Sequence, residues 1–273
     1  MRLALFGATG KAGGAILDQA HAAGYKIHAL ARSSGKLDRD GESLAVITGD
    51  VRDLAAAERV VEGADAVVSA IGGTNPANPA VLQQGTAAIL TAMNRHGVRR
   101  PIVIQGFHLP FPADPHNLGR PMMGAVLRVW NRHLSADSYR MAAVLTGSDL
   151  DWILIRMPRL TPGLPDEDYR VGELALGPWS TVTTGQVAHF TLSCLATGSF
   201  VRQAPMIAGA RRAGHKDPAE TFARRLTPAR RPTTNGSRRL AAASRLMRCG
   251  CPRPPTDPDH NRKESPCTYA LPP

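Results

Sequence analysis

Short apolar runs alternate along the chain with longer segments in which apolar residues recur at helical spacing. The runs that fit β-strands cover residues 2–6, 26–31, 44–48, 66–70, 102–105 and 151–156. The segments with helical spacing cover residues 11–23, 54–61, 80–96 and 119–145. Three of the helical segments are followed by a glycine, a common stop signal: Gly24, Gly63 and Gly97. Strands that alternate with helices predict a parallel sheet with crossover helices.

The pattern continues more weakly beyond the sixth strand. Residues 179–182 fit a short strand, 185–196 a helix and 203–207 an edge strand. The run 102–105 is apolar at nearly every position, which is typical of a strand buried on both faces. Because crossovers between parallel strands are right-handed, we predict an α/β fold: a doubly wound parallel sheet in three layers. A single domain over residues 1–209 would hold this sheet and a small substrate lobe.

The remaining residues, 210–273, differ in composition from the rest of the chain. They hold 14 Lys and Arg against 5 Asp and Glu, which is +9 of the total net charge of +11. They also hold 10 of the 22 prolines and almost no periodic apolar pattern. Such a segment cannot bury enough surface to offset its chain entropy, so we predict a basic, disordered tail. The alternative is a frame-shift product of a GC-rich gene, which an intact reading frame at the locus would exclude.

A glycine-rich turn stands between the first strand and the first helix. It reads Gly7-Ala8-Thr9-Gly10-Lys11-Ala12-Gly13. In a dinucleotide-binding turn, one glycine makes the tight turn, one admits the pyrophosphate and one allows close packing of helix and strand. The phosphates meet free N–H groups at the helix N-terminus. The turn predicts a Rossmann-type fold that binds a dinucleotide through Gly7, Ala8, Thr9, Gly10, Lys11 and Gly13; the alternative is a purely structural turn.

The end of the second strand bears on the choice of cofactor. NAD sites usually have an acidic residue there, which binds the ribose 2′-hydroxyl. This chain has Arg32 instead, followed by Ser33, Ser34 and Lys36. A guanidinium pairs with a 2′-phosphate, which a carboxylate would repel. We therefore predict NADP(H) in preference to NAD(H), with the alternative that Arg32 only points into solvent.

Two further segments follow strands at the same edge of the predicted sheet. Asp50 and Val51 follow the third strand, where a side chain can touch the adenine. Ala70, Ile71 and Gly72 follow the fourth, where small residues let the dinucleotide pass. We include all of them in the predicted cofactor site, although either segment alone fits an ordinary loop.

With these residues in place, the chain resembles the atypical short-chain dehydrogenase/reductase proteins of the NAD(P)H-binding, NmrA-like kind. Within them it is most similar to the biliverdin reductase B, or NADPH flavin reductase, type. The resemblance covers residues 1–207. It is carried by the stretches Ala4-Leu5-Phe6-Gly7-Ala8-Thr9-Gly10, Gly49-Asp50-Val51, Arg140-Met141 with Val144-Leu145, and Gln186-Val187-Ala188-His189-Phe190. It implies NADPH-dependent hydride transfer to a flavin or another conjugated small-molecule acceptor.

The chain departs from that pattern where the chemistry would occur. Similar proteins commonly have Ser or Thr after the fifth strand, but the sequence here is Gln105-Gly106-Phe107-His108. Tyr139 is followed four positions later by Ala143, so the Tyr-x-x-x-Lys pair is absent. Without the lysine to lower its pKa, Tyr139 is not expected to act as a general acid. The same absence argues against a nucleotide-sugar epimerase and leaves a non-catalytic NADP(H) sensor as the alternative to a reductase.

The predicted substrate mouth is apolar and aromatic, which suits a planar acceptor. Its candidate residues follow strands five and six: Phe107, His108, Phe111, Arg156 and Pro158. His108 is a candidate proton donor, with the alternative that it is an ordinary surface histidine. Arg156 either holds an anionic substrate group or closes the strand through a salt bridge.

The composition argues against several other partners and places. No run reaches the ~18 apolar residues that a membrane helix needs, and the first apolar run is too short for a signal peptide, so we expect a cytoplasmic protein. The cysteines of the tail, with His260, match no standard zinc spacing, so no metal is expected. The basic tail has too few aromatics for a stacking platform, so no specific nucleic acid is expected. The oligomeric state stays open, with a monomer possible.

Overall fold

The computed structural model describes residues 1–33, 37, 43–72, 80–115, 132–177 and 179–210. The chain divides into two compact units, Met1–Ala219 and Glu220–Pro273, and the second unit lies outside the described residues. The tail predicted for 210–273 therefore lies outside them except for Ala210. The domain boundary at residue 209 stays a prediction.

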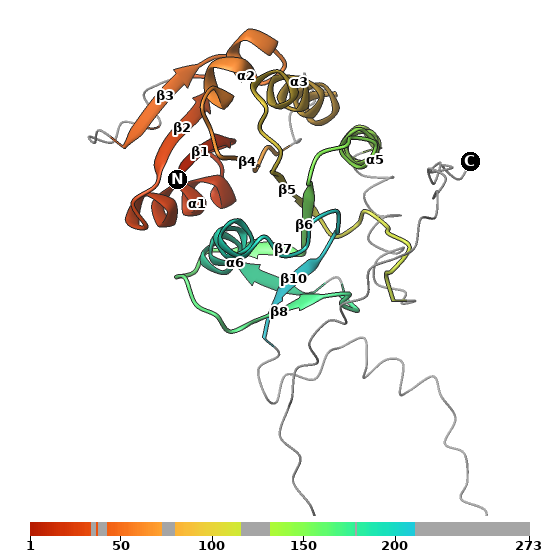
Figure 1. Ribbon diagram of the computed structural model, residues 1–273. Coiled ribbons are helices and arrows are strands. Elements are labelled where there is room, and N and C mark those ends of the chain that lie inside the picture. The colour runs from red at the N-terminus through yellow and green to blue at the C-terminus, as the bar shows by residue number, and fades with distance from the viewer. Residues whose placement is uncertain (34–36, 38–42, 73–79, 116–131, 178, 211–273) are drawn as a thin grey trace, which may run out of the picture. The chain divides into compact units, whose positions relative to one another are not determined.

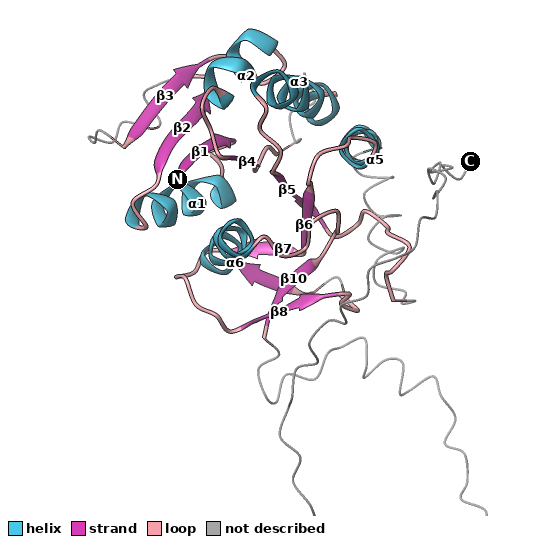
Figure 2. Cartoon of the chain, in the orientation of Figure 1, coloured by secondary structure: helices cyan, strands magenta, loops and turns pink. Residues whose placement is uncertain are grey.

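One eight-stranded sheet forms the centre of the described unit (Figures 1 and 2). In spatial order its strands are β3 (Leu44–Thr48), β2 (Lys26–Ala31), β1 (Arg2–Phe6), β4 (Ala66–Ser69), β5 (Pro101–Gly106), β6 (Ile153–Met157), β10 (Met206–Gly209) and β8 (Tyr169–Gly172). Neighbouring strands run parallel except β8, which is antiparallel to β10. A separate parallel pair joins β7 (Arg159–Thr161) to β9 (Thr181–Thr183). The predicted doubly wound Rossmann-type fold is confirmed.

Helices cover both faces of this sheet and complete three layers (Figure 1). They are α1 (Lys11–Ala22), α2 (Leu54–Val61), α3 (Val81–His96), α5 (Arg132–Thr146) and α6 (Thr184–Thr197). Helices α1 and α6 pack against each other over one core, while α3 packs between α2 and α5 over the other. The predicted helix over residues 119–145 is described only from its α5 part onward.

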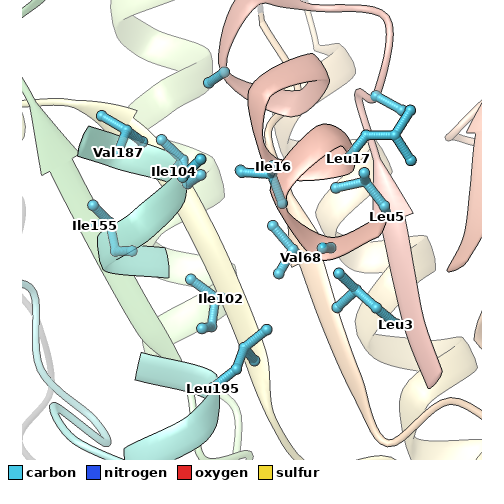
Figure 3. Packing of buried hydrophobic residues seen from close by; sticks show 14 of the residues in the cluster. Leu3, Leu5, Ile16, Leu17, Val68, Ile102, Ile104, Ile155, Val187 and Leu195 are labelled. Atoms are coloured by element: carbon cyan, nitrogen blue, oxygen red, sulfur yellow. The ribbon is translucent and has the colours of Figure 1, made fainter. Parts of the chain in front are cut away.

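The strands are apolar on both faces because each face meets a different layer of helices. In β1, Leu3 and Leu5 face the core beneath α1 and α6, whereas Ala4 and Phe6 face the core beneath α2, α3 and α5. Figure 3 shows Leu3 and Leu5 packed with Ile16 and Leu17 of α1. A polar side chain at any of these positions would be buried, which explains why all four residues are apolar.

The helix ends are stabilised by different devices. A capping box of Thr183 and Gln186 begins α6. Helix α3 has no side-chain cap at Ala80; instead Asp137 of α5 accepts hydrogen bonds from the N–H groups of Leu82 (2.8 Å) and Gln83 (3.0 Å). A carboxylate at a helix N-terminus pairs orphan N–H groups and complements the helix dipole. Asp137 therefore ties α5 to α3.

One detail of the sheet differs from the sequence prediction. The strand predicted over residues 203–207 was expected at an edge, but β10 lies between β6 and β8. Its partner β8 follows a loop rich in Pro and Gly and is only four residues long, Tyr169–Gly172. The edge prediction is wrong because β8 gave no signal.

Candidate nicotinamide-dinucleotide site

The glycine turn lies where the strand order of the sheet reverses. Strands β2 and β3 lie to one side of β1, and β4, β5 and β6 lie to the other. In open parallel sheets, ligands bind outside the carboxyl ends of the strands at this switch point. Gly7 follows β1 directly and has φ +84°, a left-handed conformation that side chains with a Cβ rarely adopt.

Two of the turn's glycines have no space for a side chain. A Cβ on Gly7 would lie 2.5 Å from the carbonyl oxygen of Ala70, and a Cβ on Gly13 would lie 2.1 Å from the carbonyl oxygen of Gly7. In both cases the obstacle is backbone, which cannot swing aside. The turn is therefore packed tightly between α1 and the end of β4, as the spacing of glycines predicts.

The N-terminus of α1 faces the same turn without a side-chain cap. Its N-cap residue is Gly10, whose own N–H donates to the carbonyl oxygen of Gly7 at 3.0 Å. Thr9, Gly10 and Lys11 are exposed, while Ala8 is buried. An uncapped helix N-terminus, next to backbone that glycines leave uncovered by side chains, is suited to bind an anion such as a pyrophosphate.

Charged side chains gather where β2 and β3 end. Arg32 is exposed after β2. Asp50 follows β3 and accepts hydrogen bonds from Nε (2.9 Å) and Nη2 (2.8 Å) of Arg52. These hydrogen bonds, with a smaller contribution from the Arg32 charge, lower the pKa of Asp50 from 3.8 to about 2. Arg52 thus balances the Asp50 charge, and Arg32 remains exposed beside this pair.

Arg52, which pairs with the predicted site residue Asp50, is not among the residues that the sequence predicts. The only sequence signal is an acidic and a basic residue two positions apart after a predicted strand, which is common in ordinary turns. Next to it, Val51 packs against α3 at Gly85, where an added Cβ would lie 2.9 Å from the Val51 side chain. Gly85 lets α3 approach the loop and hold Val51 at the edge of the sheet.

The segment after β4 closes the other side of the turn. The N–H of Ala70 donates to the carbonyl oxygen of Phe6 at 2.8 Å. Ile71 is half-buried, and Gly72 is exposed with no atom within 4 Å of an added Cβ. The structure thus brings Gly7, Ala70 and the N-terminus of α1 together as the sequence predicts, with Gly72 open on the outer side.

The predicted substrate residues are less exposed than a mouth would require. Phe107 is buried in a small cluster with Leu176 and Met206, and Pro158 is buried as well. Phe111 is half-buried beneath the guanidinium of Arg156, 4.7 Å from ring centroid to Cζ. The aromatic residues predicted to line an open mouth are therefore buried or half-buried.

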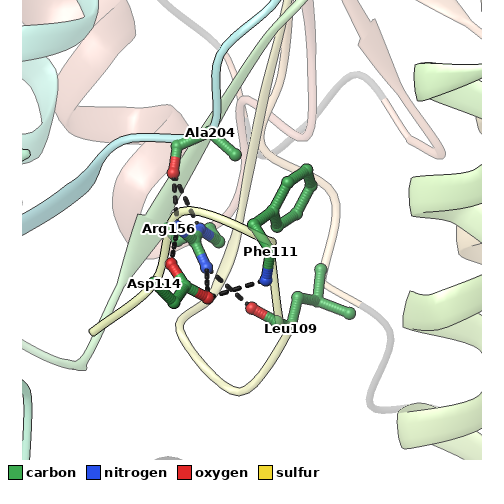
Figure 4. Close-up of polar contacts among 5 residues, drawn as sticks. All are labelled: Leu109, Phe111, Asp114, Arg156 and Ala204. Atoms are coloured by element: carbon green, nitrogen blue, oxygen red, sulfur yellow. Dashed lines mark hydrogen bonds and ion pairs between the residues drawn. The ribbon is translucent and has the colours of Figure 1, made fainter. Parts of the chain in front are cut away.

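Arg156 forms a buried clasp with that loop (Figure 4). Its Nη atoms donate to both carboxylate oxygens of Asp114, at 2.7 and 2.6 Å. The remaining N–H groups donate to the carbonyl oxygens of Leu109 and Ala204. All five guanidinium N–H groups have an acceptor, so of the two predicted roles the structure supports the salt bridge. The substrate role of Arg156 is corrected, because no donor is left for a ligand.

His108 is buried, not the surface histidine that a lone loop position suggests. It is 6% exposed, and burial lowers the pKa of its imidazole from 6.5 to about 4. Its ring meets Tyr139 of α5 edge-on, with 6.4 Å between centroids. At neutral pH the ring is uncharged, so an imidazolium is not available as a general acid.

The buried His108 should make the fold sensitive to acid. Between its unfolded pKa of 6.5 and its folded pKa of about 4, the unfolded chain binds a proton that the folded chain does not. Stability therefore rises with pH across this window and falls on acidification, by roughly 2–3 kcal/mol for this group. Urea unfolding at pH 7.5 and pH 4.5 should show a smaller loss in His108→Leu than in the parent. Equal losses would contradict the assignment.

An uncapped helix beneath a tight glycine turn, at the switch point of a parallel sheet, defines a dinucleotide-binding Rossmann protein. Residues 7–198 match a family model described as NAD(P)H-binding. The chain belongs to this family, and the predicted NAD(P)H-binding class is confirmed. Its cofactor is a nicotinamide dinucleotide.

Solved structures with the same fold support the architecture. An anaerobilin reductase of Escherichia coli O157:H7 superposes with a TM-score of 0.63 at 18% identity, covering 80% of this chain and 100% of its own. A Streptococcus pneumoniae protein named for NADH-flavin reductase activity gives 0.59 at 18% identity, covering 77% and 99%. The Lactococcus lactis oxidoreductase ylbE gives 0.63 at 18%, covering 78% and 93%. At these identities the likeness shows the fold alone.

The described residues offer no sign of other kinds of site. Among them, no group of three or more His, Cys, Asp or Glu side chains is placed to hold a metal ion. None of the described helices is long and apolar enough to cross a membrane. Burial raises the pKa of the Cys194 thiol to about 12, so this cysteine is a core residue and not a nucleophile.

Proposed function

We propose that the protein is an NADPH-dependent reductase that transfers hydride to a flavin, a quinone or a similar conjugated acceptor. The observation that carries the proposal is the glycine turn. Backbone atoms fill the space that a Cβ on Gly7 or Gly13 would need, and the turn lies beside the uncapped N-terminus of α1. This cradle fits a pyrophosphate, and the family matched over residues 7–198 is NAD(P)H-binding. A bound nicotinamide supplies the hydride.

The residues of the chain would bind and orient the two reactants. Gly7, Gly10 and the first turn of α1 would hold the pyrophosphate, while Val51 and Asp50 would meet the adenine. The acceptor would lie beyond the carboxyl ends of β5 and β6. A flavin or quinone can be reduced without a protein acid, so the missing lysine at Ala143 does not count against it. Similar folds carry the names of flavin and anaerobilin reductases.

The proposed preference for NADP(H) rests on the charges at the ends of β2 and β3. Arg52 is already paired with Asp50, which leaves Arg32 to meet a 2′-phosphate. Asp50 does not oppose this pairing, since Arg52 balances its charge. A charge-assisted pair between guanidinium and phosphate strengthens binding by about 1.5–3 kcal/mol.

Reversing the charge at position 32 should change the cofactor preference. We expect Arg32→Glu to weaken NADPH binding at least about tenfold, since the pair is lost and a carboxylate repels the phosphate. NADH binding should stay within about threefold of the parent. Titrations by nicotinamide fluorescence measure both affinities.

The matched control is Arg100→Glu, which makes the same charge change at the opposite edge of the sheet. Arg100 is exposed and precedes β5 at its amino end. It should leave both affinities unchanged. If the parent binds NADPH and NADH equally, the 2′-phosphate proposal is wrong.

Turnover tests the reductase itself. We expect NADPH absorbance to fall when FMN, dichloroindophenol or a quinone is added to the protein. The second candidate, a non-catalytic NADP(H) sensor, is favoured by Gly106, which has no hydroxyl, and by Ala143 in place of a lysine. NADPH binding without turnover of any of these acceptors would exclude the reductase and leave the sensor. The cytoplasmic location stays a prediction, and the oligomeric state stays open, with a monomer possible.

A further inference from the structure

The space beside the last residue of β5 is filled by a histidine ring. A Cβ built on Gly106 would lie 2.6 Å from Nδ1 and 3.0 Å from Cε1 of His108. The imidazole therefore occupies the position that a side chain on residue 106 would take. Strand β5 is parallel to β1, so this position lies at the same edge of the sheet as the glycine turn.

The backbone around His108 is fixed on both sides. The N–H of Phe107 donates to the carbonyl oxygen of Met157 at 2.9 Å, and the Phe107 side chain is buried. Leu109 is 1% exposed, and its carbonyl oxygen accepts from Arg156 at 2.8 Å. A side chain held between two anchored residues keeps its place without a hydrogen bond of its own.

The polar atoms at this strand end are not satisfied within the described residues. Nε2 of His108 is buried without a hydrogen-bond partner there, and so is Nε2 of the preceding Gln105. Buried polar groups in proteins are normally paired, so each exception calls for an explanation. For Gln105, a ligand that supplies an acceptor is one such explanation, since this end of β5 borders the cofactor edge. The unpaired Nε2 of His108 instead bears on which ring nitrogen carries the proton.

The neutral ring carries one proton, whose position follows from burial. A proton on Nε2 would leave a buried donor unpaired, and orphaned buried N–H groups are rarer than unsatisfied acceptors. The proton therefore belongs on Nδ1, the nitrogen beside Gly106. A neutral Nδ1–H is a hydrogen-bond donor that does not change charge at physiological pH.

We infer that His108 is a substrate-contacting residue whose Nδ1–H donates a hydrogen bond to a carbonyl oxygen of the conjugated acceptor. This inference rests on the proposed reductase function. Flavins and quinones both carry such carbonyl groups conjugated to the atoms that accept the hydride. A donor there orients the ring and stabilises the negative charge that develops on the oxygen during reduction. His108 keeps its proton throughout.

Three substitutions of His108 distinguish the roles of its two ring nitrogens. Asparagine places an amide N–H near the position of Nδ1, glutamine reaches toward Nε2, and leucine matches asparagine in shape without a donor. For His108→Leu and His108→Gln we expect kcat/KM for dichloroindophenol to fall at least about tenfold. His108→Asn should stay within about threefold of the parent. NADPH affinity should change less than about twofold in all three.

Binding gives a readout that does not depend on turnover. Titration of the NADP⁺-loaded protein with FMN, followed by flavin fluorescence, should show the same order of affinities: parent and His108→Asn above His108→Gln and His108→Leu. Equal FMN affinities and equal kcat/KM for His108→Asn and His108→Leu would overturn the inference while leaving the reductase in place. A parent that neither binds nor reduces any acceptor would overturn both.

A substitution at Gly106 tests the same inference even if the variants of His108 fail to fold. Gly106→Ala places a methyl 2.6 Å from Nδ1, and the obstacle is the end of a side chain that can rotate away. The protein should fold, with an unchanged NADPH affinity, but its imidazole is displaced. We expect the same loss of FMN affinity as in His108→Leu, and parental FMN affinity in Gly106→Ala would overturn the inference.

Discussion

Replacing Asp114 by alanine should lower the free energy of unfolding by about 3–5 kcal/mol. The change leaves the Arg156 guanidinium in the core with no counter-charge, and the two side chains are only 1% and 2% exposed. It also removes the acceptor for the N–H of Phe111, which donates to Asp114 at 2.7 Å. Urea unfolding at neutral pH measures the loss.

A surface ion pair of similar length provides the control. Arg95 and Glu58 are 2.7 Å apart, but their side chains are 59% and 28% exposed. Glu58→Ala should cost less than about 1 kcal/mol, because solvent screens the pair. Equal losses of stability in the two alanine variants would show that burial does not strengthen the pair of Asp114 and Arg156, and would contradict the role assigned to it.

A double-mutant cycle identifies the source of the loss at Asp114. Arg156→Met removes the buried charge while keeping much of the side chain's volume. When it is combined with Asp114→Ala, the total loss should be smaller than the sum of the two single losses, since no unpaired charge is left behind. An additive result would show that the two side chains do not act as a pair.

The sequence predicts most of the fold because the signals for strands and turns are local. The alternation of short apolar runs with helical segments places every parallel strand from β1 to β6. Gly7 adopts a left-handed conformation and Gly13 approaches the carbonyl oxygen of Gly7 closely, and both requirements lie within one turn of the chain. Requirements of this kind can be predicted from the sequence because the residues involved lie close together along the chain.

The parts of the site that depend on distant partners could not be predicted. Arg156 and Asp114 are 42 residues apart, and Asp137 caps a helix that begins 56 positions earlier at Val81. The burial of His108 depends on its packing against Gly106 and against Tyr139 of α5. In each case the sequence shows a polar residue near a strand or in a helix, while the partner that decides its role comes from elsewhere.

Adding one methyl group at Gly13 should disable the cofactor site. A Cβ there would lie 2.1 Å from the carbonyl oxygen of Gly7 and 3.0 Å from Cα of Ala8. Since both obstacles are backbone, Gly13→Ala must push α1 away from the turn. We expect NADPH affinity to fall more than about tenfold and the free energy of unfolding to fall by about 1–3 kcal/mol. Nicotinamide fluorescence and urea unfolding measure the two effects.

The neighbouring glycine supplies the matched control. A Cβ on Gly14 would lie 3.5 Å from the carbonyl oxygen of Ala8, an ordinary contact. Both substitutions replace glycine by alanine in the first turns of α1, so both gain the same kind of helix propensity, up to about 1 kcal/mol. Only Gly13→Ala adds the collision with Gly7. The difference between the two variants therefore isolates the close approach of helix and turn, and equal NADPH affinities would show that the cofactor does not depend on it.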